Sequence, residues 1–278
     1  MPTSAASTLN DPAQVRYRPG IRCICMKFFW LRALPGWLAI PTLGLAAPAR
    51  TPAITEGRTA YASAGKEIRV ETFLPPGQER HPAVIVLYGS GGSLSGKKDM
   101  VKISRRLAGE GMSVFLIHYF HRTGTLYAND ARITRWWRTW RDTVRDGVTY
   151  VSQHPRVNPS SIGVYGYSLG AYLAVAEAGR NPQIDAVVEL SGGLFDEVRN
   201  RLTRLPPTLI LHGRLDERVP VSRAHDLERT AGHLGLKPEV HIYEKEAHVL
   251  SDVAMADADA RAIQFLKKHL QLRASTRP

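Results

Sequence analysis

Short runs rich in Val, Ile and Leu recur along the chain, and between them lie longer segments in which apolar residues return every three or four positions. The runs are typical of buried strands, and the longer segments are typical of amphipathic helices. The expected strands span residues 67–73, 81–87, 113–120, 162–165, 186–192, 207–213 and 239–243. The expected helices span residues 99–109, 132–153, 169–179, 222–235 and 257–270. This alternation predicts an α/β fold with a mostly parallel sheet covered by helices on both faces.

The helix expected at 132–153 begins with a stretch that mixes arginine with tryptophan, as some nucleic-acid and membrane sites do. Its apolar residues nevertheless recur on one helical face: Ile133, Trp137, Trp140, Val144, Val148 and Val151. Such a stripe indicates packing against the sheet. We therefore expect no nucleic-acid partner, interpret the arginines as a solvated face, and leave Trp136, which lies off the stripe, as a residue that borders the site or a partner.

The segment Gly166-Tyr167-Ser168-Leu169-Gly170 carries the main candidate chemistry, because it lies between the apolar run 162–165 and the helix that follows. A serine at such a turn has a strained backbone, and the flanking glycines let neighbouring chain approach without a Cβ clash. The pattern predicts an exposed hydroxyl at Ser168 that acts as a nucleophile. A serine hydroxyl needs a histidine to take its proton and a carboxylate to orient that histidine.

Two later loops supply the histidine and the carboxylate. Asp216 follows the strand expected at 207–213, and His248 follows the strand at 239–243. The loops at the carboxyl ends of parallel strands converge on one crevice, so residues far apart in sequence meet there. Glu189, near the end of another expected strand, is an alternative acid or a pocket group, since a buried charge needs a partner.

These segments resemble the α/β-hydrolases of the dienelactone-hydrolase-related group over roughly residues 65–270. The resemblance rests on Tyr88-Gly89-Ser90-Gly91-Gly92, on residues 166–170 and 212–220, and on Ala247-His248. It implies an α/β-hydrolase fold in which Ser168 is the nucleophile, Asp216 the acid and His248 the base, with no cofactor. Members of the superfamily cleave carboxylic esters, and some branches cleave amides or peptides, through an acyl-enzyme. Dienelactone hydrolases proper carry cysteine at the elbow, so Ser168 favours a serine esterase acting on a small-molecule ester.

The tetrahedral intermediate of acyl transfer carries an oxyanion that needs fixed donors. We expect one donor to be the backbone N–H of Leu169 and the second that of Ser90 or Gly91; the alternative is that the glycine-rich loop is only a strand-to-helix turn.

Aromatic residues near the expected strand ends are candidate pocket residues: Tyr88, Tyr119, His121 and Tyr167. His118 and His121 form an H-x-x-H pair, but they fall at the end of an expected strand and no clustered third ligand follows. We therefore expect no metal site.

The chain has 278 residues, of which 44% are hydrophobic, and this is enough for one large core. We expect a single catalytic domain over residues 50–278. The formal net charge of +12 favours approach to anionic substrates or acidic surfaces.

The first 49 residues resemble a secretory signal peptide. A basic stretch begins at Met26, the run 33–45 is apolar, and Ala47-Pro48-Ala49 has the small residues of a cleavage site. We expect Met26 to be the true start, residues 1–25 to be an upstream extension, and the enzyme to be exported to the periplasm or secreted. The apolar run is short and contains two prolines, so we expect no stable membrane span in the mature form. Both cysteines, Cys23 and Cys25, precede the expected cleavage site.

The sequence therefore predicts an exported serine hydrolase that cleaves a carboxylic ester. Two alternatives stay open at this point. The first is an amidase or peptidase with the same three residues, because a triad does not choose the leaving group. The second is a non-catalytic binding protein that retains the fold.

Overall fold

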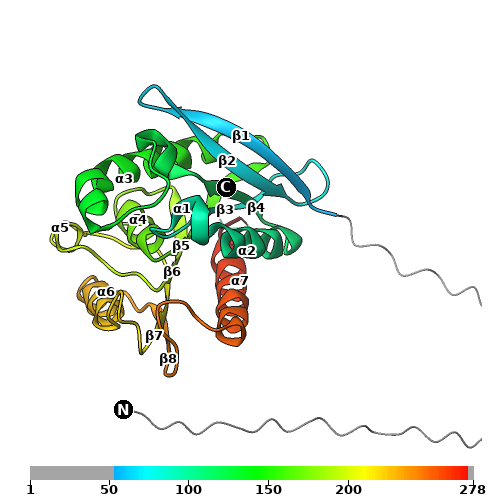
Figure 1. Ribbon diagram of the computed structural model, residues 1–278. Coiled ribbons are helices and arrows are strands. Elements are labelled where there is room, and N and C mark those ends of the chain that lie inside the picture. Colours follow the sequence, from blue (N-terminus) through cyan, green and yellow to red (C-terminus); the bar gives the residue numbers. More distant parts are fainter. Residues whose placement is uncertain (1–52, 275–278) are drawn as a thin grey trace, which may run out of the picture. The chain divides into compact units, whose positions relative to one another are not determined.

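The computed structural model describes residues 53–274, and Figure 1 shows its elements. The strands are β1 (Thr55–Ser63), β2 (Lys66–Leu74), β3 (His81–Leu87), β4 (Ser113–Ile117), β5 (Val157–Tyr167), β6 (Ile184–Leu190), β7 (Thr208–Gly213) and β8 (Glu239–Tyr243). The helices are α1 (Gly92–Ser95), α2 (Lys97–Gly109), the 3₁₀ helix η1 (Tyr119–Thr123), α3 (Asp130–Ser152), α4 (Leu169–Ala178), α5 (Asp196–Arg199), α6 (Ser222–His233) and α7 (Asp252–Ala274).

The eight strands form one sheet in the order β1-β2-β4-β3-β5-β6-β7-β8. The pairs from β4 to β8 are parallel, whereas β1 and β2 join antiparallel at one edge. Helices α3, α4 and α6 lie on one side of the sheet, and α2 and α7 lie on the other (Figure 1). An ion pair between Arg106 and Asp259, with 2.7 Å from N to O, joins α2 to α7. The expected α/β architecture, a mostly parallel sheet between helices, is confirmed.

The core lies on both faces of the central strands. Every residue of β4, β6 and β7 is buried, which explains why these strands are mostly apolar and show no alternation of apolar and polar residues. On α3, the expected stripe packs inward: Trp137, Trp140, Val144, Val148 and Val151 are buried, and Ile133 is partly buried. Trp136 is partly buried too, and the Arg135 guanidinium lies 4.9 Å from the centre of its ring.

Several element bounds differ from those expected. Strand β1 was not predicted, because its outer half is polar and exposed and shows no apolar alternation. The strand expected at 113–120 ends at Ile117 and continues as η1, so the side chains beyond it do not alternate between faces. Helix α7 begins at Asp252, five residues earlier than expected.

The described residues belong to one compact unit. Within residues 53–274, no helix combines the length and the apolar character that a membrane crossing requires. The expected signal peptide, its start at Met26 and both cysteines lie outside the described residues.

Candidate active site

Ser168 occupies a sharp turn between β5 and α4. Its backbone has φ 52° and ψ −120°, a conformation that costs a non-glycine residue of order 1–3 kcal/mol. Two hydrogen bonds hold the turn: the Ser168 N–H donates to the carbonyl of Leu190 (2.8 Å), and the Ala171 N–H donates to the carbonyl of Ser168 (2.9 Å). The strain is therefore maintained by the neighbouring strand and by the first turn of α4.

The two flanking glycines are required by close backbone contacts. A Cβ built on Gly166 would lie 2.4 Å from the carbonyl oxygen of Gly170. A Cβ on Gly170 would lie 2.3 Å from the carbonyl oxygen of Leu87 and 2.5 Å from that of Tyr88. These neighbours are backbone atoms of α4, of β3 and of the loop after β3, so they cannot move aside as a flexible side chain would. The sequence-based explanation of the glycines is confirmed.

The structure brings Ser168, His248 and Asp216 together in one hydrogen-bonded chain. His248 Nε2 lies 3.0 Å from Ser168 Oγ, and His248 Nδ1 lies 2.7 Å from Asp216 Oδ2. The other carboxylate oxygen, Oδ1, accepts hydrogen bonds from the backbone N–H groups of Arg218 (2.9 Å) and Val219 (2.7 Å). Asp216 is therefore held as an acceptor on both oxygens, which leaves His248 Nδ1 to donate and His248 Nε2 to accept.

A second histidine, which the sequence analysis did not single out, lies behind the carboxylate. His212 Nε2 is 2.8 Å from the carbonyl oxygen of Val219 and 3.2 Å from Asp216 Oδ2. Burial lowers the pKa of His212, so its ring is neutral near pH 7 and its Nε2 carries the proton that faces these two oxygens. The signal in the sequence was its position on β7, four residues before the acid.

Tyr167 positions the loop that carries His248. Its hydroxyl donates to the His248 carbonyl oxygen (3.2 Å), and the two ring centres are 5.5 Å apart. Burial raises the pKa of Tyr167 to about 12, so the hydroxyl stays protonated and remains a donor. Tyr167 thus lies at the site, as the sequence predicted.

Backbone donors lie beside the Ser168 hydroxyl. Leu169 begins α4, ahead of the first intrahelical hydrogen bond, so its N–H has no partner within the helix. The glycine-rich loop after β3 turns its carbonyl groups toward its own chain. Those of Gly89, Ser90 and Gly91 accept from the N–H groups of Gly92, Ala128 and Leu94 at 3.0, 2.7 and 3.2 Å. In the described part of the chain, the N–H groups of Ser90 and Gly91 make no backbone hydrogen bond, and both residues line a cavity that also contains Ser168.

Two cavities meet at Ser168 and Ser90. The first, of about 290 Å³, extends toward α3 and α5, and its lining includes Ile133, Tyr172, Phe195 and Val219. The second, of about 310 Å³, extends toward α2 and α7, and its lining includes Met100, Tyr167, His248 and Met255. The Ser168 hydroxyl therefore has space on both sides for the two halves of a substrate.

Three of the four pocket candidates lie outside these two cavities. Tyr88 and Tyr119 are buried in the core, where their rings stack with centres 4.7 Å apart and the Tyr119 hydroxyl donates to the Tyr88 carbonyl (2.8 Å). His121 lies in η1, where its Nδ1 accepts from the Arg69 N–H (3.5 Å). For Tyr119 and His121 the expectation that they line the pocket was wrong, because the strand ends at Ile117 and η1 turns them toward the core and β2. Tyr88, which follows β3, packs in the core.

The H-x-x-H pair has a structural role instead. His118 is buried against Glu71, with 2.9 Å from Nε2 to Oε1, and Lys97 Nζ lies 2.6 Å from the same carboxylate oxygen. Burial lowers the pKa of His118 to about 4. No cluster of three or more potential metal ligands occurs among residues 53–274.

Glu189, the alternative acid, does not contact His248. It is fully buried in β6, where its Oε1 accepts from the Gly192 N–H, and its Oε2 has no hydrogen-bond partner. Burial raises the pKa of Glu189 to about 8, so the side chain is neutral near pH 7. The position beside His248 belongs to Asp216.

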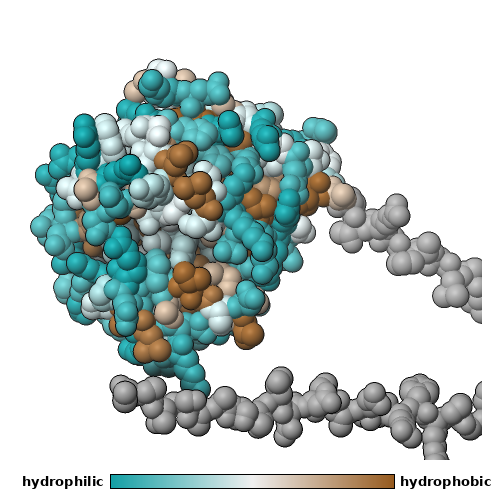
Figure 2. Space-filling view, in the orientation of Figure 1, coloured by the Kyte–Doolittle hydropathy of each residue, from teal (hydrophilic) through white to brown (hydrophobic). Residues whose placement is uncertain are grey.

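Large exposed apolar side chains surround the site. In the described part of the chain they are Leu94, Leu126, Tyr127, Leu215, Val249 and Val253. All of them lie in segments that follow the carboxyl ends of β3, β4, β7 and β8, at the same edge of the sheet as Ser168. Figure 2 shows several hydrophobic groups on this face around a paler centre.

Comparisons with known proteins agree with this architecture. The chain is 28% identical over 144 residues to the peroxisomal succinyl-coenzyme A thioesterase of Mus musculus, a match that covers 50% of this chain and 31% of the relative. It is 31% identical over 127 residues to acyl-coenzyme A thioesterase 3 of Mus musculus, covering 46% of this chain and 27% of the relative. The chain thus spans less than a third of the length of these curated relatives.

Solved structures show the same fold at low sequence identity. The dienelactone hydrolase of Anabaena variabilis superposes with a TM-score of 0.63 at 18% identity, covering 78% of this chain and 99% of the other. The acylaminoacyl peptidase of Pyrococcus horikoshii superposes with a TM-score of 0.64 at 15% identity, covering 80% of this chain and 42% of the other. The family model described as the dienelactone hydrolase family matches residues 68–270, which is most of the described structure. The chain belongs to the dienelactone hydrolase family.

Proposed function

We propose that the protein is a serine hydrolase that cleaves a carboxylic ester through an acyl-enzyme on Ser168. The observation that carries the proposal is the chain of two hydrogen bonds, 3.0 Å and 2.7 Å long, that joins Ser168 through His248 to Asp216 between the two cavities. A nucleophile, a base and an orienting carboxylate at hydrogen-bond distance are the elements that nucleophilic acyl transfer requires.

In the proposed mechanism, His248 Nε2 takes the hydroxyl proton as Ser168 Oγ attacks the ester carbonyl carbon. The positive charge that forms on the imidazole is stabilised by Asp216, which accepts from His248 Nδ1. The oxyanion accepts hydrogen bonds from the N–H groups of Leu169 and of Ser90 or Gly91. His248 then gives its proton to the leaving alcohol, and a water molecule hydrolyses the acyl-enzyme by the same steps.

The position of His248 assigns the two cavities in this proposal. The imidazole must protonate the leaving group, and His248 lines only the second cavity. The leaving group therefore occupies the second cavity, beside Met100 and Met255. The acyl group occupies the first cavity, beside Ile133 and Phe195.

A thioester is a second candidate substrate, because the curated relatives are acyl-coenzyme A thioesterases. The same residues serve for it, since a thiolate leaves in place of an alkoxide. Kinetics with an ester and a thioester of the same acyl group separate the two candidates. Each kcat/KM is divided by the rate of the uncatalysed reaction of the same substrate. The ester proposal predicts that the value for the ester is at least equal to that for the thioester.

Covalent labelling with a fluorophosphonate tests the mechanism. Peptide mass spectrometry should locate the label on Ser168, and the label should be lost in Ser168→Ala. If the folded wild-type protein takes no label, the non-catalytic binding protein replaces this proposal. Turnover of a matched amide at a rate equal to the ester's would favour the amidase alternative.

A further inference from the structure

A basic pocket lies next to the first cavity. Helix α3, the end of α4 and the region of α5 enclose about 190 Å³, and we call this space the arginine pocket. Its charged residues are Arg138, Arg141, Arg180, Arg201 and Glu197. Val198 and Leu202 form an apolar part of its wall. The pocket thus combines guanidinium groups with a small hydrophobic surface.

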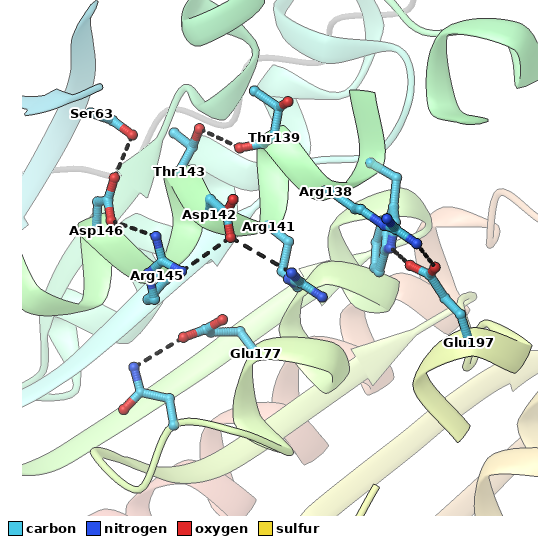
Figure 3. A network of polar contacts seen from close by, with 12 residues as sticks. Ser63, Arg138, Thr139, Arg141, Asp142, Thr143, Arg145, Asp146, Glu177 and Glu197 are labelled. Carbon is cyan, nitrogen blue, oxygen red and sulfur yellow. Dashed lines mark hydrogen bonds and ion pairs between the residues drawn. The ribbon is translucent and has the colours of Figure 1, made fainter. Parts of the chain in front are cut away.

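The arginines outnumber the carboxylates that pair with them. Arg138 Nη2 lies 2.9 Å from Glu197 Oε2, whereas the carboxylate nearest to Arg141 is that of its chain neighbour Asp142, at 3.7 Å. Within residues 53–274, Arg180 and Arg201 make no ion pair within 4.0 Å. Figure 3 shows Arg138 directed at Glu197, and Arg141 beside Asp142.

One further carboxylate lies near this cluster. Glu177 interacts electrostatically with Arg141 and Arg180, but it is buried, and burial raises the pKa of its carboxyl group. Asn181 Nδ2 donates to its Oε1 (3.0 Å). The wall of the pocket itself therefore holds four positive charges and one negative charge, and like charges this close repel one another unless an anion lies between them.

The arginine pocket and the first cavity share no lining residue, but the same two segments of the chain, α3 and the region of α5, contribute to both. On α3, Ile133 and Thr134 line the first cavity, and Arg138 and Arg141 line the arginine pocket one to two turns further along. On the other wall, Phe195 lines the first cavity, and Glu197, two residues further along, lines the arginine pocket. Trp137 bridges the walls between these two spaces: its ring packs on Phe195 (4.6 Å between ring centres), and its Nε1 donates to Glu197 Oε1 (2.6 Å). An acyl chain that reaches the arginine pocket therefore passes over this contact.

We propose that the arginine pocket binds a carboxylate or phosphate at the far end of the substrate's acyl group. Guanidinium groups match both anions in geometry and charge. This inference rests on the proposed function, because it takes the first cavity as the acyl side. It names the class of acyl group: a chain that is apolar near the scissile bond and anionic at its distal end.

The helix sets the length of that chain. From Thr134 to Arg141 is about 10 Å at 1.5 Å per residue. An extended chain advances roughly 1.3 Å per bond, as the 3.8 Å spacing of successive Cα atoms over three bonds shows. The anion therefore lies about eight carbons beyond the part of the acyl group held in the first cavity. An acyl group of four carbons is too short to reach the arginine pocket.

Matched ester substrates test the proposal. Each pair has the same nitrophenol leaving group and an acyl chain of 4 to 16 carbons that ends in a carboxylate or in the neutral carboxamide. The readout is the ratio of kcat/KM for the acid to kcat/KM for the amide, measured at about 10 mM ionic strength, where charge interactions are least screened. We expect the ratio to stay near its short-chain value at four carbons and to rise at least tenfold in the longer chains.

Three variants test whether the preference for the acid over the amide comes from the arginine pocket. In Arg141→Gln/Arg180→Gln, the long-chain ratio should fall about tenfold, the size expected when hydrogen bonds to a charged group are lost. The control Arg58→Gln/Arg261→Gln removes the same charge from β1 and α7 and should keep the wild-type ratio. In Glu197→Gln, the ratio should rise, because the competing carboxylate is gone. A folding defect lowers both kcat/KM values together and leaves the ratio unmoved.

The proposal is overturned if the wild-type ratio shows no dependence on chain length, or if both double variants lower it equally. Binding of inorganic phosphate distinguishes a site for the anionic end of the substrate's acyl group from a site for a free anion. If phosphate binds to the wild type and not to Arg141→Gln/Arg180→Gln, while the acid-to-amide ratio does not change with chain length, the pocket is a site for a free anion. The proposal that it binds the end of the acyl group is then wrong. If no ester is hydrolysed, calorimetry with dodecanedioate still tests whether the arginine pocket binds the end of a dicarboxylic chain. Binding that is weaker in Arg141→Gln/Arg180→Gln and unchanged in Arg58→Gln/Arg261→Gln supports this role of the pocket even where the catalytic proposal has failed.

Discussion

Replacing Glu189 by Gln should remove a pH dependence of stability that the buried carboxyl imposes. Burial raises the pKa of Glu189 from 4.5 to about 8 in the folded protein. The unfolded chain therefore releases a proton above pH 4.5 that the folded protein retains up to about pH 8, so folding loses stability as the pH rises between these values. The difference between the two pKa values corresponds to about 5 kcal/mol in total, or about 1.4 kcal/mol for each pH unit.

The assay is chemical unfolding of wild type and Glu189→Gln at pH 5, 6, 7 and 8. The free energy of unfolding of the wild type minus that of the variant should fall by about 1.4 kcal/mol per pH unit over this range and level off above pH 8. Subtraction cancels the other titrating groups. The glutamine's own packing cost does not depend on pH, so it shifts the difference without tilting it.

Glu244→Gln is the matched control. Glu244 is exposed, and the hydrogen bond from Arg214 lowers the pKa of its carboxyl, so its contribution changes only below pH 4.5. Its difference from the wild type should be flat from pH 5 to pH 8. A flat difference for Glu189→Gln as well would refute the reasoning, because it would mean that the buried carboxyl is already ionised at pH 5.

Four further outcomes follow from the geometry. Gly170→Ala should unfold or inactivate the protein, because its Cβ would lie 2.3 and 2.5 Å from backbone oxygens. Gly232→Ala, whose Cβ would have nothing within 4 Å, should instead raise the free energy of unfolding by about 1 kcal/mol. Thermal unfolding of the two variants and the wild type checks both outcomes. Asp216→Asn should lower kcat by about 10⁴, since the amide no longer holds His248 in the required tautomer, and a loss below tenfold would contradict the proposed role. Tyr167→Phe removes only the bond to the His248 carbonyl and should cost about tenfold or less in kcat/KM. Expression of the full gene in a bacterial host should give an exported protein whose first residue follows Ala49; an intact amino terminus by mass spectrometry would contradict export by a cleaved signal.

Asp216 and Glu189 show why the sequence left the acid open. Both are carboxylates that lie near the ends of strands that approach the crevice. Strand β7 lies between β6 and β8, so the loop that follows it is next to the loop that carries His248. The choice between the two residues therefore depended on strand order, which a periodic pattern does not encode.

His121 and Tyr119 show a second limit. The apolar run from Ser113 favoured a strand through Phe120, but η1 begins at Tyr119 and redirects the side chains that follow. Element ends are decided by tertiary contacts, such as the bond from the His118 N–H to the Arg69 carbonyl (3.0 Å). The pocket assignments that depended on the strand end were wrong for that reason.

Local sequence determined the strands, the helices and the elbow at Ser168. Strand and helix periods follow from side-chain geometry within a few residues. The glycines at 166 and 170 are required by close backbone contacts that an elbow of this kind makes. The tertiary structure alone decided what meets at the elbow: His212 behind Asp216, Tyr167 against the His248 loop, and two cavities on either side of the serine. His212 and Asp216 are only four positions apart, but Tyr167 and His248 are 81 positions apart, and the two cavities are lined by residues from distant segments. The distances between these groups depend on how the strands are ordered and how the helices pack, which no local pattern specifies.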